Sequence, residues 1–169
     1  MAQGSESQFE FFYSKSSPFS QHHPSKFVID GITFNCAEQY MMYSKAVLFN
    51  DTEMQLKILS APNPNQQKKF GRQVSNFDEK IWKSKCEDIV KRASIAKFQQ
   101  NEDLQEELFK TFPKLLVEAS PRDTIWGIGL GASDPKAHDK KTWRGQNKLG
   151  YILTEVRNQL MDDQSQEKK

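Results

Sequence analysis

The chain has 169 residues, of which 36% are hydrophobic and 27% charged, and its net charge is +2. This length predicts one domain with its own core, taken here as residues 9–161. No apolar run approaches the roughly 20 residues that span a bilayer, and residues 1–8 lack the pattern of a secretory signal. We therefore expect an intracellular, cytoplasmic protein without membrane contact, and the interleaved charges do not indicate a general polyanion-binding surface.

Cysteine and histidine are too sparse for a structural zinc site, which needs about four ligands at recognisable spacing. Cys36 and Cys86 lie far apart in the sequence, and neither belongs to a Cys/His cluster. We expect reduced thiols, no metal and no cofactor, although the sequence leaves a disulfide open. His22 and His23 are expected to be surface histidines, because no acidic residue follows at ligand spacing.

The N-terminal region carries strand signals. Residues 9–13 (FEFFY) and the two runs on either side of Asp30-Gly31 are β-rich. Both positions of a two-residue hairpin turn need positive φ, which Asp-Gly supplies, so a hairpin is predicted there. Residues 14–25 are rich in Ser and Pro, and they are predicted to form a loop suited to a binding rim.

From Cys36 onward the pattern is helical. Asn35 is the predicted N-cap of the first helix, with Glu38 three residues later. The apolar spacing predicts further helices as far as Phe109, and the predicted helical ranges are 36–49, 52–61, 64–71, 77–98 and 101–109.

The C-terminal third begins with a predicted buried strand at 114–120 and an extended or turning segment at 124–130. A long polar loop follows at 131–147, and Asn147 is the predicted N-cap of a last helix with an apolar face as far as Leu160. Residues 1–8 and 162–169 are expected to be flexible ends. The whole pattern predicts a predominantly helical α+β fold with a small N-terminal hairpin and a few short strands.

The first candidate site lies on the helix that begins near residue 36. Glu38 and Lys45 are seven residues apart, so they project from nearly the same face. Burial raises the pKa of a Glu and lowers that of a Lys, which brings both towards neutral pH. The alternative is structural: Asn35 and Glu38 fit a capping box, and Lys45 can be a solvated side chain. Spacing alone leaves both open.

The second candidate is EASPRDTIWGIG, residues 118–129. Glu118 ends the predicted strand, Asp123 follows a Ser-Pro turn, and Trp126-Gly127 would let backbone approach a ligand beside a flat aromatic surface. A loop-capping aspartate with a core tryptophan explains the same residues.

Asn147, the 16–25 loop and Trp82 offer further candidates. Asn147 precedes the last helix, whose N–H groups favour an anion, but it can equally be an N-cap alone. The 16–25 loop offers the Ser17 hydroxyl and the Phe19 ring. Trp82 is a core residue by default, with stacking on a base as the alternative.

Taken together, these motifs resemble the NADAR (YbiA-like) family. They occur in the family's order and span the chain from about Phe12 to Leu160; they are SPFS, DGITFNCAEQYMMYSKA, GRQVSNFD–IW, KFQQN, EASPRDTIWGIG and WRGQNKLG. The resemblance implies a small helix-rich α+β protein that needs no metal and cleaves ribose from nitrogen bases. Family members remove ADP-ribose from the amino group of guanine in nucleic acid, or act on phosphorylated ribosylamino-pyrimidine intermediates of the riboflavin pathway.

The resemblance also implies residue roles. Lys45 would form a Schiff base with the opened ribose, while Glu38 or Asp123 moves protons. In the alternative route a carboxylate activates water directly, and Lys45 only binds or positions. The other candidates are substrate contacts: Trp82 and Trp126 for base or ribose, Ser17, Phe19, Gly127 and Asn147 for the phosphate-ribose part, and Glu118 at the pocket edge.

We favour ADP-ribosylated guanine, as a nucleotide or in nucleic acid, because the chain shows no fused deaminase or reductase of riboflavin synthesis. A small ribosylamine metabolite is the second substrate class. A non-catalytic module that binds ADP-ribose or NAD is the third reading. Oligomeric state is left open.

Overall fold

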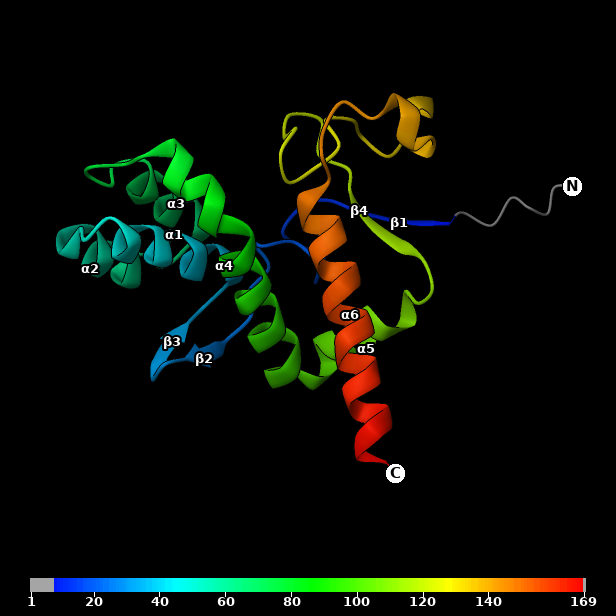
Figure 1. Ribbon diagram of the computed structural model, residues 1–169, viewed down its shortest axis with the longest axis horizontal. Coiled ribbons are helices and arrows are strands. Elements are labelled where there is room, and N and C mark those ends of the chain that lie inside the picture. The colour runs from blue at the N-terminus through cyan, green and yellow to red at the C-terminus, as the bar shows by residue number, and fades with distance from the viewer. Residues whose placement is uncertain (1–7, 169) are drawn as a thin grey trace, which may run out of the picture. The chain divides into compact units, whose positions relative to one another are not determined.

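The computed structural model describes residues 8–168 and divides into two compact units. The central unit is Gln21–Glu102, and the two-segment unit combines the described residues up to Ser20 with those from Asp103 onward. Each unit is described by itself (Figure 1). Residues 1–7 of the expected N-terminal flexible end lie outside the described residues.

The central unit opens with the predicted hairpin. β2 (Phe27–Ile29) pairs antiparallel with β3 (Ile32–Phe34). Asp30 and Gly31 form the turn with φ of 52° and 78°, which confirms the positive-φ turn expected from the sequence. The rings of Phe27 and Phe34 stack across the pair with centroids 5.8 Å apart, and both side chains are buried.

Four helices complete the central unit, and all four were predicted close to these bounds. They are α1 (Ala37–Leu48), α2 (Thr52–Ser60), α3 (Pro64–Gly71) and α4 (Glu79–Gln100). α1 packs against the other three helices and against β3. Asp51, Asn63 and Asp78 cap α2, α3 and α4, each accepting a backbone N–H through its side chain. The core of this unit includes Phe27, Phe34, Ala37, Tyr40 and Ala93.

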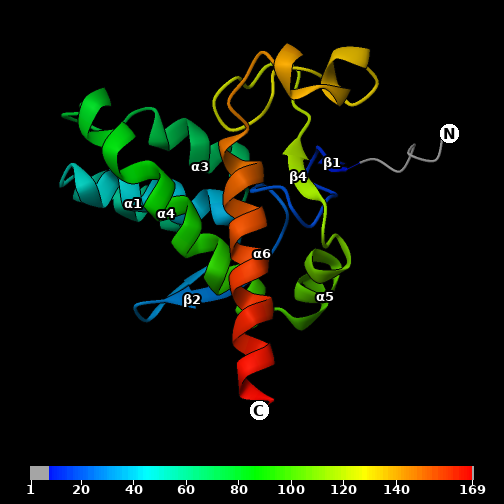
Figure 2. The same ribbon diagram turned by 45° about the vertical axis from the view of Figure 1, so that its right-hand side comes forward.

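The two-segment unit is built around a parallel strand pair. β1 (Phe9–Phe12) pairs with β4 (Leu115–Glu118), and α6 (Lys148–Glu167) packs on β4. Both ribbon views show β1 beside β4 (Figures 1 and 2). α5 (Glu102–Lys110) leads into β4, and the 3-10 helices η2 (Pro135–His138) and η3 (Lys140–Thr142) lie within the predicted loop. The core includes Phe9, Val117, Ile128, Leu130 and Ala137.

The C-terminal segment differs from its prediction. Residues 162–167 were expected to be a flexible end, but α6 continues as far as Glu167. The apolar pattern stops at Leu160, so periodicity could not predict the helix beyond it. Glutamine and glutamate in this last part favour a helix without providing an apolar face. Gln164 also donates a hydrogen bond from its side chain to Gln105 Oε1 on α5.

The described residues therefore form the predominantly helical α+β fold with a small hairpin and short strands that the sequence predicts. Within residues 8–168, no helix combines the length and the apolar character that crossing a membrane requires.

Candidate functional site

The first turn of α1 places Glu38 inside the central unit, where only 7% of the residue is exposed. The predicted capping box is wrong in its register, because Cys36 rather than Asn35 occupies the N-cap position. Gln39 is therefore the third helical residue, and its Oε1 accepts the Asn35 N–H at 2.7 Å. Since Gln39 takes this role, the capping explanation for Glu38 falls away.

His22 lies beside Glu38. Its Nε2 is 3.6 Å from Glu38 Oε1, and about a third of its side chain is exposed. The neighbouring Gln21 carbonyl accepts the Glu38 N–H at 3.0 Å, which fixes this part of the loop against α1. The side chain is thus partly exposed, but nothing in the sequence indicated its contact with Glu38. The contact spans sixteen positions that include the β2–β3 hairpin, so no periodic pattern within one element could indicate it.

Lys45 is half-buried on α1, two turns after Glu38. Burial lowers its pKa from the ordinary lysine value, the negative charge of Glu38 opposes that effect, and the positive charge of Arg72 adds to it. A larger share of this amine is therefore neutral near pH 7 than for an exposed lysine. A neutral amine is the form that attacks a carbon centre.

Two aromatic rings surround the amine of Lys45. Its Nζ lies 4.5 Å from the centroid of Phe77 and 5.7 Å from that of Trp82. Trp82 is partly buried instead of sitting in the core as its default interpretation predicted. Phe77, 44% exposed, was missed by the sequence analysis. The sequence feature that could have indicated Phe77 is its place in the SNFD motif, immediately before Asp78, the N-cap of α4.

In the two-segment unit, Asp123 shapes a turn. Its Oδ1 accepts the N–H groups of Ile125 and Trp126 at 2.9 and 2.8 Å, which is the loop-capping role left open by the sequence. A Cβ on Gly127 would lie 2.9 Å from the Glu118 carbonyl oxygen. Gly127 is thus required by packing of the loop against the end of β4, and it is buried.

Asn147 lies at the predicted N-cap position of α6 with φ of 53°, but its side chain makes no capping hydrogen bond. Oδ1 accepts the Glu118 N–H at 2.9 Å, and Nδ2 donates to the Leu116 carbonyl at 3.1 Å. The residue is fully buried. Backbone groups on that edge of β4 need partners, and this amide supplies them.

The remaining sequence candidates lie in the same unit. Ser17 Oγ accepts the Phe19 N–H at 3.2 Å, and the buried Phe19 ring contacts Phe12 edge-on at 5.8 Å. Glu118 and Trp126 are partly buried. Direct substrate contacts by these four residues stay predictions.

The structure thus brings Glu38, Lys45 and Trp82 together on the central unit and adds His22 and Phe77. Asp123 belongs to the other unit, so its partnership with the α1 pair stays a prediction. Among the described residues, no group of three or more His, Cys, Asp or Glu side chains is arranged to hold a metal ion.

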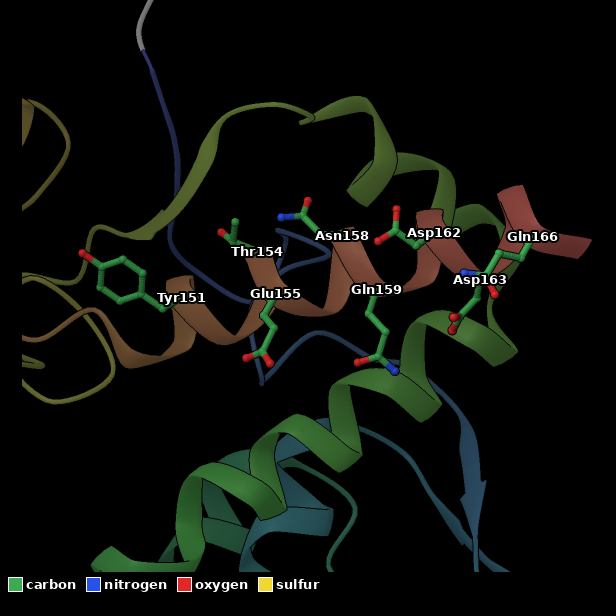
Figure 3. Close-up of a pocket in the computed structure, with 8 residues that line it drawn as sticks. All are labelled: Tyr151, Thr154, Glu155, Asn158, Gln159, Asp162, Asp163 and Gln166. Carbon is green, nitrogen blue, oxygen red and sulfur yellow. The ribbon is translucent and has the colours of Figure 1, made fainter.

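A surface pocket follows one side of α6 and contains none of the sequence-predicted site residues (Figure 3). Its lining is polar and acidic: Tyr151, Thr154, Glu155, Asn158, Gln159, Asp162, Asp163 and Gln166. Three of these side chains are carboxylic acids, which disfavours a phosphate-bearing ligand.

Comparison with known proteins defines the class of this helix-rich α+β chain. Residues 8–161 match the NADAR domain, so the chain belongs to the NADAR family. It is 42% identical to "N-glycosidase R617" of Acanthamoeba polyphaga mimivirus, covering 82% of this chain and 85% of that protein. For "Protein irg-1" of Caenorhabditis elegans the identity is 40%, over 90% of this chain and 79% of the relative.

"N-glycosidase YbiA" of Escherichia coli is 34% identical, with 88% of this chain and 86% of the relative covered. The NMR structure of E. coli YbiA superposes with a TM-score of 0.76 at 31% identity, covering 92% of this chain and 86% of that one. The fold and the family are therefore the ones that the sequence motifs indicated.

Proposed function

We propose that this chain removes ADP-ribose from the amino group of guanine in nucleic acid, through a Schiff base on Lys45. The chain is a hydrolase that acts on N-glycosyl bonds, the class to which its named N-glycosidase relatives belong. The observation that carries the proposal is the presence on α1 of a half-buried lysine with a lowered pKa and, two turns before it, a buried carboxylate whose charge acts on that lysine.

The chemistry begins with ring opening of the ribosylamine. Proton donation to the ring oxygen breaks its bond to C1 and leaves an iminium between C1 and the guanine nitrogen. The neutral amine of Lys45 adds to C1, and a proton passes from this amine to the guanine nitrogen. The bond from C1 to guanine then breaks, leaving a protonated Schiff base on Lys45. Water adds to it, and loss of the amine frees the aldehyde form of ADP-ribose.

Glu38 serves as the proton carrier in this scheme. As an acid it protonates the leaving nitrogen, and as a base it takes a proton from water. His22 Nε2 lies 3.6 Å from Glu38 Oε1, so the imidazole is the ring beside this carboxyl group. The negative charge of Glu38 also raises the pKa of Lys45 against the larger effect of burial.

Phe77 and Trp82 supply the surface for the base. Both rings lie within 6 Å of the Lys45 amine, and neither is fully buried. Stacking on such rings suits any planar base and is worth about 1–3 kcal/mol per base. A base stacked here would place its exocyclic nitrogen near the nucleophile.

A second candidate is hydrolysis of a phosphorylated ribosylamino-pyrimidine. The observation in its favour is the charge of the chain, which is interleaved and has a net value of only +2. Protein surfaces that bind nucleic acid are usually strongly basic. This substrate uses the same Lys45 and Glu38 chemistry.

The test uses both substrates in parallel. Wild-type protein is incubated with an oligonucleotide ADP-ribosylated on guanine and with the riboflavin intermediate, and products are followed by mass spectrometry. Borohydride added during turnover should leave a covalent ribose adduct on Lys45. Lys45→Ala should lose at least about 100-fold in rate, the lower end of the usual effect of a catalytic group.

Lys57→Ala is the matched control, since Lys57 is an exposed lysine paired with Glu53 on α2. It should keep full activity. Absence of an adduct together with an active Lys45→Ala would refute the Schiff base. Tight binding of ADP-ribose without release of either base would instead identify a binding module.

A further inference from the structure

The end of α3 is locked against α1 close to Lys45. Gly71, the last residue of α3, is buried, and a Cβ at this position would overlap Met42 Sδ and lie 3.0 Å from Met42 Cγ. A larger residue at this position would require the Met42 side chain to move. Met42 lies three residues before Lys45, and positions three apart are neighbours on a helix surface. The residue after Gly71 is therefore held beside the part of α1 that carries the amine.

That residue is Arg72. It forms the C-cap of α3, and its N–H donates to the Lys68 carbonyl at 3.1 Å, so the backbone is fixed while the side chain is exposed. Arg92, on the same unit, pairs with Asp30 at 3.0 Å. In the described part of the chain, by contrast, the Arg72 guanidinium has no carboxylate within 4.0 Å.

Two positive groups set side by side repel each other unless an anion joins them. Arg72 lies close enough to Lys45 for its positive charge to lower the pKa of that lysine. A guanidinium presents a planar fork of N–H donors that matches phosphate in a bidentate arrangement, whereas an ammonium acts as a point charge. The pair therefore suits a ligand with a phosphoryl group next to a reacting carbon.

We propose that Arg72 binds the phosphoryl group attached to C5 of the substrate's ribose while Lys45 faces C1. This inference rests on the proposed function, which puts C1 at Lys45. It adds a phosphate contact on the central unit, separate from the contacts predicted in the other unit. The phosphoryl group is part of a pyrophosphate in ADP-ribose, and a monophosphate in the riboflavin intermediate.

Arg72 has a second effect in the same arrangement. Its positive charge adds to the effect of burial in lowering the pKa of Lys45, which raises the neutral share of the amine in the unliganded protein. Removal of the Arg72 charge raises the pKa of Lys45, so the rise of activity with pH shifts to higher pH. A purely structural role for Arg72 would leave the pH profile in place.

The experiment measures binding without turnover. Titration calorimetry follows ADP-ribose, ribose 5-phosphate and unphosphorylated ribose on wild type, Arg72→Gln, Arg72→Lys and the matched control Arg92→Gln. Loss of a charge-assisted hydrogen bond weakens binding by about 10- to 100-fold. We expect that loss in Arg72→Gln for the phosphorylated ligands, a smaller loss in Arg72→Lys, and wild-type affinity in Arg92→Gln.

Several outcomes separate the two proposals. If wild type binds neither phosphorylated ligand, or Arg72→Gln binds both as tightly as wild type, the inference is wrong even when the enzyme cleaves the guanine substrate. If Arg72→Gln loses affinity but wild type cleaves no ribosylated base, the phosphate contact stands and the proposed function fails. Preference for ADP-ribose over ribose 5-phosphate identifies the pyrophosphate as the source.

Discussion

At the scale of a single residue, the side chain of Asn147 makes the hydrogen bonds that a neighbouring strand would otherwise make with β4. β4 pairs with β1 along one edge, and the peptide groups of Leu116 and Glu118 point to the other edge. There the Asn147 amide binds one group of each residue, and Thr154 Oγ1 accepts the Leu116 N–H at 3.0 Å. A buried asparagine that satisfies backbone resembles an N-cap in sequence, because both uses place it just before a helix.

Asn147→Ala should therefore destabilise the fold by about 2–4 kcal/mol, since it leaves one buried donor and one buried acceptor without partners. Chemical denaturation measures this. Asn76→Ala is the control, because Asn76 is exposed and has a similar positive φ of 60°. Equal losses in the two variants would mean that backbone strain, and not the β4 contact, is responsible.

At the scale of elements, the local signals were sufficient for the helices and the hairpin. Helix-capping residues and the Asp-Gly turn act within a few positions, so the sequence contains them directly. The contacts that define the candidate site join distant positions: His22 with Glu38, and Lys45 with Phe77. Spacing on α1 predicted Glu38, Lys45 and their common face, but it contains no information about what the loop and α4 place beside them.

The contact between α1 and α3 gives a prediction at this scale. Gly71→Ala puts a methyl group onto Met42 Sδ and should cost about 1–3 kcal/mol by overpacking. Because it moves Arg72 away from Lys45, it should also weaken binding of phosphorylated ribose.

The control for Gly71→Ala is a double mutant. Met42→Ala removes the overlapping side chain, so the double variant should lose less stability than the sum of the two single variants, as measured by denaturant unfolding. If the stability losses of the two single variants add exactly in the double variant, the side chains at positions 42 and 71 do not overlap.

At the scale of the whole molecule, each unit has a core of its own, and the central core encloses a lysine. Lys97 is 2% exposed, and its pKa is lowered to about 7 by burial, with Cys36 opposing the shift. The unfolded chain has an ordinary lysine pKa, so between about pH 7 and 10 it binds more protons than the folded chain. Stability from this group is therefore lowest below pH 7 and rises with pH through that window.

Lys97→Met tests this linkage. The variant cannot titrate, so its stability relative to wild type should fall as pH rises from 7 to 10, by up to about 1.4 kcal/mol per pH unit. Urea unfolding at several pH values measures the difference. Lys83→Met, on the exposed face of α4, should show no such trend. A stability difference between Lys97→Met and wild type that is independent of pH would contradict the lowered pKa.

The parallel pairing of β1 with β4 has a consequence for how the chain acquires this structure. Phe9 meets Leu115 across that pair, which closes a loop of about a hundred residues before any ladder bond forms. The hairpin and helices of Gln21–Glu102 close much shorter loops. During synthesis the contacts of the central unit can therefore form early. β1 has no strand partner until β4 has left the ribosome. We expect the pairing of these two strands, which are distant in sequence, to be the slow step.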